Sequence, residues 1–168
     1  IDVKVAGGDI FRFGAAEVRV IDTPGHTLGH ITYWLPDAGI AFVGDTLFAL
    51  GCGRVIEGTA DMMWASLEKL QTLPDTTEIY CGHEYTEANA RFALTIEPDN
   101  VELAARAAGV TKLRAAGRMT LPTTIGAEKR TNPFLRAREA GIRSRLGMAD
   151  AAPAQVFAEI RKRKDTFR

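Results

Sequence analysis

The sequence predicts an α/β fold, in which a strand-rich segment of residues 1–97 precedes a helical segment of residues 98–168. Up to residue 45, short apolar runs with alternating or β-branched residues recur about every ten residues, with glycine-containing turns between them. The hydrophobic period then changes to that of amphipathic helices. Beyond residue 99 the chain is rich in alanine and leucine, and proline and glycine break its helical stretches.

The expected strands are short and form hairpins in a packed sheet. Five lie near the start of the chain, in "IDVKV", "DIFRF", "AEVRVID", "HITYWLP" and "GIAFVGD". A sixth, "TEIYCGH", ends at His83, and no strand is expected after it. No low-complexity linker separates the two segments, so we expect them to pack together.

The helical signals begin with "DMMWASLEKLQTL", where Asp61 is the expected N-cap. One face of that helix carries Met63, Trp64, Leu67, Leu70 and Leu73. A second helix is expected in "TEANARFALTI", and a third begins at a cap on Asp99 or Asn100 and ends at Gly117. Further helical stretches follow in "TIGAEKRTNPFLR", "AREAGIRSRLG" and "PAQVFAEIRKRKD".

The composition is that of an ordinary folded protein. The 168 residues are 46% hydrophobic and 25% charged, which is enough apolar material for a core. Lys and Arg equal Asp and Glu at 21 each, so neither nucleic acid nor an anionic membrane is an expected partner. Two cysteines make no disulfide framework, and a reducing cytoplasm is the expected location.

Three apolar strands each end on a potential metal ligand that follows a glycine. The ligands are His26, Asp45 and His83, and the glycines before them are Gly25, Gly44 and Gly82. Strand ends hold functional groups rigidly while the adjoining loop stays open. Imidazole and carboxylate are ligands of zinc, iron and manganese, so the pattern predicts a metal site brought together by the tertiary structure.

Other candidates for chemistry are weaker. His30 is either a fourth ligand or, as we favour, a packed histidine that supports the ligands. Cys81 and His83 form a C-x-H pair, but a free cysteine in an apolar strand usually acts as a small hydrophobe. Cys52 has no nearby base, and no serine has the context of a nucleophile elbow.

The stretches "TPGHTLGH", "GDTLFALGCGR", "EGTAD", "CGHEYT" and "TNPFLR", in that order, resemble the glyoxalase II family. These are the hydroxyacylglutathione hydrolases of the metallo-β-lactamase superfamily, and the resemblance covers nearly the whole chain. It implies part of an αββα sandwich, a metallo-β-lactamase-like domain in residues 1–97, and a helical glutathione-binding domain in residues 98–168.

The resemblance also implies an activity and a site. The reaction is hydrolysis of S-(2-hydroxyacyl)glutathione, such as S-lactoylglutathione, to glutathione and a 2-hydroxy acid at two divalent metal ions, which are zinc, iron or manganese. It assigns His26 to one ion, His83 to the other and Asp45 as the bridge, with His30 outside the ligand set.

The glutathione-binding residues that the resemblance implies are Arg54, Tyr85, Arg161 and Lys164. The alternative interpretation of Arg161 and Lys164 is a solvated helix end that favours cations. Where many members of the family have tyrosine, this chain has Ile56.

One departure from the family matters for activity. The family's T-H-x-H-x-D-H motif, which supplies the other ligands, does not occur in this sequence. We therefore expect the chain to be the C-terminal part of a longer monomeric protein, with reduced or no metal occupancy and no useful turnover by itself. Its open sheet edges favour self-association. The alternatives are another thioesterase of the superfamily, a glutathione persulfide dioxygenase, or a non-catalytic remnant.

Overall fold

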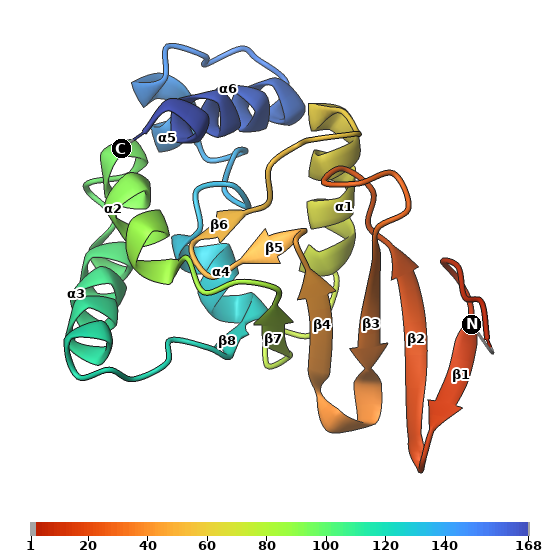
Figure 1. The fold of residues 1–168 in the computed structure, drawn as a ribbon. Coiled ribbons are helices and arrows are strands. Elements are labelled where there is room, and N and C mark those ends of the chain that lie inside the picture. Colours follow the sequence, from red (N-terminus) through yellow and green to blue (C-terminus); the bar gives the residue numbers. More distant parts are fainter. Residues whose placement is uncertain (1–2, 168) are drawn as a thin grey trace.

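One six-stranded sheet forms the centre of the fold, in a computed structural model that describes residues 3–167 (Figure 1). The strands are β1 Ile10–Phe13, β2 Ala16–Asp22, β3 Ile31–Leu35, β4 Ile40–Gly44, β7 Glu78–Cys81 and β8 Thr123–Thr124. They lie in the order β1-β2-β3-β4-β7-β8, and only β4 and β7 pair in parallel. A separate hairpin of β5 Leu47–Phe48 and β6 Gly51–Cys52 follows β4. The α/β prediction is confirmed.

Five of the six expected strands are confirmed as β1, β2, β3, β4 and β7. The expected strand "IDVKV" is wrong over residues 3–5, and residues 1–2 lie outside the described part. In the turn that follows, the N–H of Gly7 donates to Asp22 Oδ1 at 2.8 Å, and the N–H of Gly8 donates to the Val20 carbonyl of β2 at 3.0 Å. The chain therefore turns into β1 without adding a strand before it.

The expectation of no strand after residue 83 is also wrong. Strand β8 pairs antiparallel with β7, where Thr123 lies opposite Ile79 and Thr124 opposite Glu78. Two residues are too few to show an alternating pattern. Thr124 also caps the next helix, so the local sequence indicates only a helix start.

The helices fall on the predicted helical stretches, although α1 begins one residue earlier and α6 ends one residue later than predicted. They are α1 Ala60–Gln71, α2 Thr86–Ile96, α3 Val101–Ala115, α4 Ile125–Thr131, α5 Ala140–Arg145 and α6 Pro153–Thr166, with a 3-10 turn at Pro36–Ala38. Asp61 is wrong as the cap of α1, because the Thr59 hydroxyl accepts the capping bond and Asp61 lies inside the first turn. Asn100 caps α3. Within residues 3–167, no helix combines the length and apolarity needed to cross a membrane.

The larger of two hydrophobic clusters in residues 3–167 joins the sheet to helices from both predicted segments. Its fully buried members include Ala41, Val43, Leu67, Leu70, Ile79, Ile125, Phe134, Val156, Phe157 and Ile160. Helix α6, the last in the chain, lies against α1, which belongs to the first segment (Figure 1). The two segments therefore share one core, while the domain boundary at residues 97 and 98 stays a prediction.

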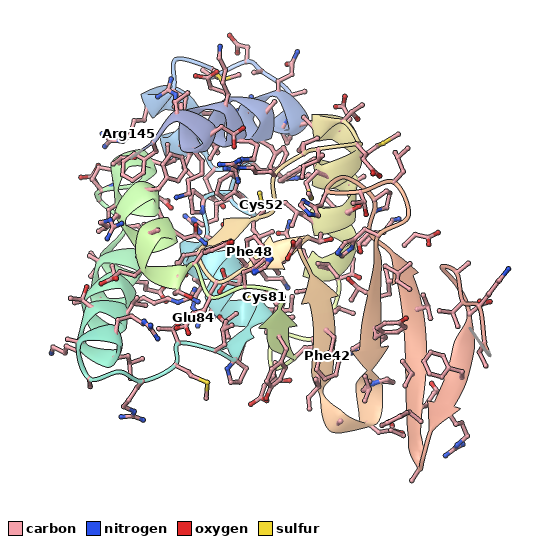
Figure 2. The ribbon with its side chains drawn as sticks, in the orientation of Figure 1. Phe42, Phe48, Cys52, Cys81, Glu84 and Arg145 are labelled. Carbon is pink, nitrogen blue, oxygen red and sulfur yellow. The ribbon has the colours of Figure 1, made fainter. Side chains whose placement is uncertain are left out.

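The sheet has one covered face and one open face. Ala41 and Val43 of β4 are fully buried, whereas Phe42 between them points to the other face and is 47% exposed (Figure 2). Tyr33 and Tyr80 flank Phe42 on the neighbouring strands. The core therefore lies on the side of the sheet opposite to Phe42.

We predict that Phe157→Ala lowers the free energy of unfolding by about 3–5 kcal/mol, as for other large core truncations. The Phe157 ring is fully buried, with centroids 6.1 Å from Trp64 and 6.0 Å from Phe134. Urea unfolding, followed by tryptophan fluorescence and by circular dichroism, should show one transition displaced to lower urea by both probes.

The matched control is Phe13→Ala on the edge strand β1. Phe13 is 77% exposed, so its loss should change the free energy of unfolding by less than about 1 kcal/mol. Two separate transitions, with the fluorescence transition unmoved in Phe157→Ala, would contradict a shared core.

Candidate metal centre and adjoining cavity

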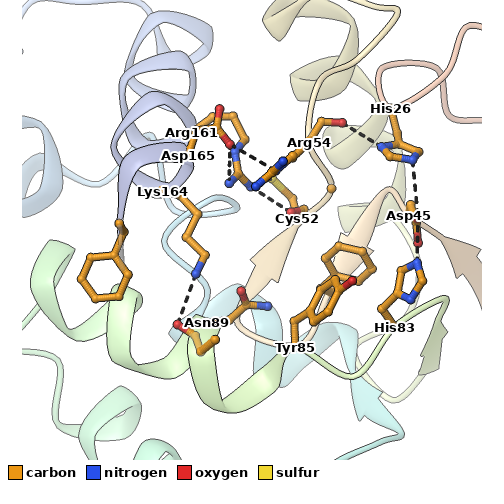
Figure 3. A pocket seen from close by; sticks show the side chains of 14 residues that line it. His26, Asp45, Cys52, Arg54, His83, Tyr85, Asn89, Arg161, Lys164 and Asp165 are labelled. Atoms are coloured by element: carbon orange, nitrogen blue, oxygen red, sulfur yellow. Dashed lines mark hydrogen bonds and ion pairs between the residues drawn. The ribbon is translucent and has the colours of Figure 1, made fainter.

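His26, Asp45 and His83 meet at the ends of neighbouring strands (Figure 3). Asp45 follows β4 directly and His83 follows β7. These strands run parallel, so their carboxyl ends share an edge of the sheet. The loop after β2 brings His26 to the same place. Its Nε2 lies 3.3 Å from Asp45 Oδ2, and Nε2 of His83 lies 3.4 Å from the same oxygen.

The three side chains form a row with the carboxylate in the middle. Among residues 3–167, no group of three or more His, Cys, Asp or Glu side chains is gathered closely enough to hold a single metal ion. One carboxylate oxygen facing an imidazole nitrogen on each side instead fits an oxygen shared by two ions, each with one histidine. Imidazole and carboxylate are also the ligand types of dinuclear zinc, iron and manganese sites.

A backbone carbonyl orients His26. The Nδ1 of His26 lies 2.9 Å from the carbonyl oxygen of Arg54. A carbonyl only accepts hydrogen bonds, so Nδ1 carries the proton, and the neutral ring keeps its lone pair on Nε2, the nitrogen that faces Asp45. Metal-binding histidines are commonly oriented by such a partner on the other ring nitrogen, so the local structure fits a ligand role for His26.

His30 packs against the backbone of Asp45, and both of its ring nitrogens form hydrogen bonds to protein atoms. Its Nε2 accepts from the backbone N–H of Asp45 at 3.1 Å. Its Nδ1 lies 2.9 Å from the Thr23 hydroxyl and 3.0 Å from the Thr46 hydroxyl. Burial, and then the neighbouring His26, lower the pKa of His30, which favours the neutral ring that these bonds require. The geometry therefore fits a His30 that holds Asp45 in position. Neither ring nitrogen of His30 is left free to bind a metal ion as a fourth ligand.

Two glycines leave room for this arrangement. A Cβ at Gly82 would lie 2.4 Å from Asp45 Oδ1, so a side chain there would displace the carboxylate. Gly44 has φ +48°, a left-handed conformation, and a Cβ there would lie 2.6 Å from His30 Nε2. The glycines that precede Asp45 and His83 in the sequence thus allow close packing of the row.

A cavity of about 520 Å³ runs from this row toward α6. His26, Asp45 and His83 line one end, and Arg54, Arg161 and Lys164 line the other (Figure 3). Tyr85 also lines it; its ring stacks on His83 with centroids 5.1 Å apart. All seven predicted site residues therefore face one cavity. Ile56, which is 65% exposed, is not among the residues that line it.

The cations at the far end differ in how freely they can bind a ligand. Arg161 is only 7% exposed, which excludes the interpretation of its side chain as part of a solvated helix end. It donates to the Cys52 carbonyl and to Asp165, both at 2.9 Å, while its Nε is buried without a partner. Burial lowers the pKa of Lys164, with further lowering by Arg161, Arg91 and Arg54. The side chain of Arg54 is 73% exposed.

The surroundings of the two cysteines fit packing roles. Cys52 lines the cavity, but burial raises the pKa of its thiol to about 11, so it stays protonated at neutral pH. Burial also raises the pKa of Cys81, whose thiol donates to the His83 carbonyl at 3.2 Å. Both features match cysteines with a packing role.

Sequence reasoning missed other residues that line the cavity, notably Phe48, Asn89 and Asp165. Phe48 packs edge-on against His83 and Tyr85. Asp165 was recognisable, because it follows Arg161 by four residues on a helix, the spacing of an ion pair. Nothing local in the sequence marks Phe48 or Asn89.

Two family models match the chain in succession. The model described as Metallo-beta-lactamase superfamily matches residues 1–83, and the model described as Hydroxyacylglutathione hydrolase C-terminus matches residues 84–167. Hydroxyacylglutathione hydrolases of Brucella anthropi and Brucella ovis are 63% and 62% identical over 167 residues, or 99% of this chain. The chain spans 64% and 65% of the length of these two relatives.

Solved structures show the same fold. ETHE1 from Myxococcus xanthus is 29% identical with a TM-score of 0.56, over 99% of this chain and 61% of that chain. A metallo-beta-lactamase from Staphylococcus aureus subsp. aureus COL is 25% identical with a TM-score of 0.55, over 94% and 42%. TTHA1623 in a di-iron-bound form is 26% identical with a TM-score of 0.51, over 78% and 47%.

We predict that Gly82→Ala weakens binding of Zn²⁺ or Co²⁺ by about tenfold or more, the usual effect of disturbing a ligand's surroundings. The added methyl group would push the Asp45 carboxylate out of line with the two imidazoles. Competition with a chromogenic chelator measures the dissociation constants.

Gly29→Ala is the matched control, because no atom lies within 4 Å of the Cβ that it adds. It should bind metal as the unmodified chain does. Equal affinities in Gly82→Ala and Gly29→Ala, with both proteins folded by circular dichroism, would argue against Asp45 as a ligand.

Proposed function

Because this chain belongs to the hydroxyacylglutathione hydrolase family of the metallo-β-lactamase superfamily, we propose that its protein hydrolyses S-(2-hydroxyacyl)glutathione thioesters such as S-lactoylglutathione. The products are glutathione and a 2-hydroxy acid. The observation that carries the proposal is the single cavity with a His–Asp–His row at one end and cationic side chains at the other. This separation suits a substrate that has a reactive thioester and distant carboxylates.

The cationic end of the cavity is proposed to hold the glutathione part of the substrate. Glutathione presents carboxylates, which guanidinium and ammonium groups bind by charge-assisted hydrogen bonds. Arg54 is exposed enough to reach a ligand, and Lys164 has a side chain that borders the cavity. Arg161 is bonded to Cys52 and Asp165, so its contribution is mainly a positive potential unless those bonds rearrange.

The row at the other end is proposed to hold two divalent ions, one with His26 and one with His83, with Asp45 shared. When bound, such ions acidify a water molecule and polarise the thioester carbonyl. The chain's own part is to fix the ligands: His30 holds the backbone of Asp45, and the Arg54 carbonyl orients His26. The relative TTHA1623 in a di-iron-bound form supports two ions on this fold.

The ligand count suggests that metal binding by this chain alone is weak. Three ligands shared by two ions leave each ion with about two protein ligands, fewer than the three typical of a catalytic zinc site. We therefore expect reduced or no metal occupancy and slow turnover by the chain on its own. The high identity to hydroxyacylglutathione hydrolases favours this activity over the other superfamily reactions and over a non-catalytic role.

We predict that Lys164→Met weakens binding of S-methylglutathione, a stable substrate analogue, by roughly 10–100-fold, the loss of one charged hydrogen bond. Methionine retains an apolar stem to pack on the Phe92 and Phe167 rings, which the lysine head group now approaches at 5.4 Å. Isothermal titration calorimetry measures the dissociation constants.

The control for this variant is Lys162→Met, which removes the same charge from an exposed position on α6 outside the cavity. It should bind the analogue nearly as the unmodified chain does. A similar loss in both variants would indicate only a general electrostatic effect and would count against the proposed glutathione site.

We predict that any hydrolysis of S-lactoylglutathione by the chain requires added Zn²⁺ and disappears in Asp45→Asn. The amide of asparagine keeps the shape of the side chain but removes the charge that the two ions would share. Thiol release is followed with a thiol-reactive dye. A rate that survives either chelation or Asp45→Asn would contradict the proposed centre, whereas fast turnover with two tightly held ions would contradict only the expectation of weak occupancy.

A further inference from the structure

The "TNPFLR" stretch, residues 131–136, carries the family resemblance but supplies no residue to the cavity. Asn132 in this stretch follows α4 and is fully buried. A buried amide without partners is costly, so its bonds are informative. They lead from α4 to the β5–β6 hairpin and from there to the His–Asp–His row.

The Asn132 amide holds both strands of the hairpin. Its Nδ2 donates to the carbonyl of Phe48 in β5 at 3.2 Å and to the carbonyl of Gly51 in β6 at 2.9 Å. Its Oδ1 accepts from the backbone N–H of Phe134 at 3.0 Å. This last bond fixes the orientation of the amide, because a flipped amide would lose every hydrogen bond that the side chain makes.

A buried carboxylate completes the attachment at the tip of the hairpin. Glu128 of α4 is fully buried, and its Oε2 accepts from Asn132 Nδ2 and from the backbone N–H of Leu50, both at 2.9 Å. Leu50 has φ +58°, a left-handed conformation that is costly for a residue with a side chain. Arg106 and Thr123 bond to the other oxygen of Glu128, so the charge is compensated.

The hairpin and the two residues that follow it contact every member of the row. At the base of the hairpin, the backbones of Gly53 and Asp45 lie close together. A Cβ added at Gly53 would be 1.8 Å from the carbonyl oxygen of Asp45. The next residue is Arg54, whose carbonyl accepts from His26. On the other side, the Phe48 ring packs edge-on against His83, with ring centroids 6.2 Å apart.

We propose that Asn132 is a positioning residue for the metal centre. It fixes the β5–β6 hairpin, and through the hairpin it sets the Arg54 carbonyl that orients His26 and the Phe48 ring that packs on His83. The inference rests on the proposed ligand roles of these histidines. It assigns to the helical segment a part in arranging the ligands, in addition to supplying cations to the cavity.

Asn132→Asp tests this with little change in shape. The aspartate keeps an acceptor for Phe134 but replaces the donating NH₂ by an oxygen that faces two carbonyls and the Glu128 carboxylate. The hairpin should then move away from α4. The control is Ile142→Ala, which creates a cavity at a fully buried position of α5 that does not line the cavity of the site.

The first readout needs no metal. The chain has three histidines, so long-range ¹H–¹⁵N spectra can assign each ring. At a pH of about 8, His26 of the unmodified chain should show a single tautomer with its hydrogen on Nδ1, where the Arg54 carbonyl accepts it. Asn132→Asp should lose that single tautomer, and Ile142→Ala should keep it. A merely structural role for Asn132 would lower stability in both variants without changing the tautomer of His26.

The second readout is the dissociation constant of Co²⁺, which should rise about tenfold or more in Asn132→Asp and stay nearly unchanged in Ile142→Ala. An unchanged tautomer and an unchanged Co²⁺ affinity in folded Asn132→Asp would overturn the inference. Should that variant not fold, Asn132→Ala, which lacks the added charge, is judged by the same criteria. If the unmodified chain binds no Co²⁺, the proposed function fails, while the tautomer comparison still tests the positioning.

Discussion

The Asp45 carboxylate faces an imidazole on each side, and the rest of the site is arranged around this contact. The Nε2 atoms of His26 and His83 lie 3.3 and 3.4 Å from Asp45 Oδ2. At such distances an imidazole lone pair and a carboxylate oxygen repel each other unless a cation or a proton lies between them. The parallel pairing of β4 and β7 brings Asp45 and His83 to one edge of the sheet, and the glycine at position 82 lets the backbone approach the carboxylate closely. His30 holds Asp45 by accepting a hydrogen bond from its backbone N–H.

The helical segment contributes to the site in two ways because it shares the core of the sheet. Helix α6 packs on α1 and brings Arg161 and Lys164 to the cavity. Helix α4 and the residue that follows it hold the β5–β6 hairpin through Glu128 and Asn132. The proposed reaction needs both ends of the cavity at a fixed separation, and one continuous core provides that rigidity.

Much of the fold was predictable from the sequence, since strong periodic patterns marked most strands and helices, and three strand ends marked the residues that we propose as ligands. The failures have local causes. "IDVKV" has the composition of a strand, but its described residues 3–5 pair with no strand, and β8 is too short to show a pattern. Asp61 and Thr59 are both good caps, and geometry decides between them. The bonds of Asn132 join residues 81 and 84 positions apart, so no local pattern reveals them.

We propose that His26 and His83 bind ions on either side of Asp45 and that His30 binds none. Ring ¹⁵N shifts during a Zn²⁺ titration of the chain test this most directly. The Nε2 resonances of His26 and His83 should move to metal-bound values, and those of His30 should stay in place. Metal-bound shifts for His30, or for only one of the two proposed ligands at saturation, would contradict it.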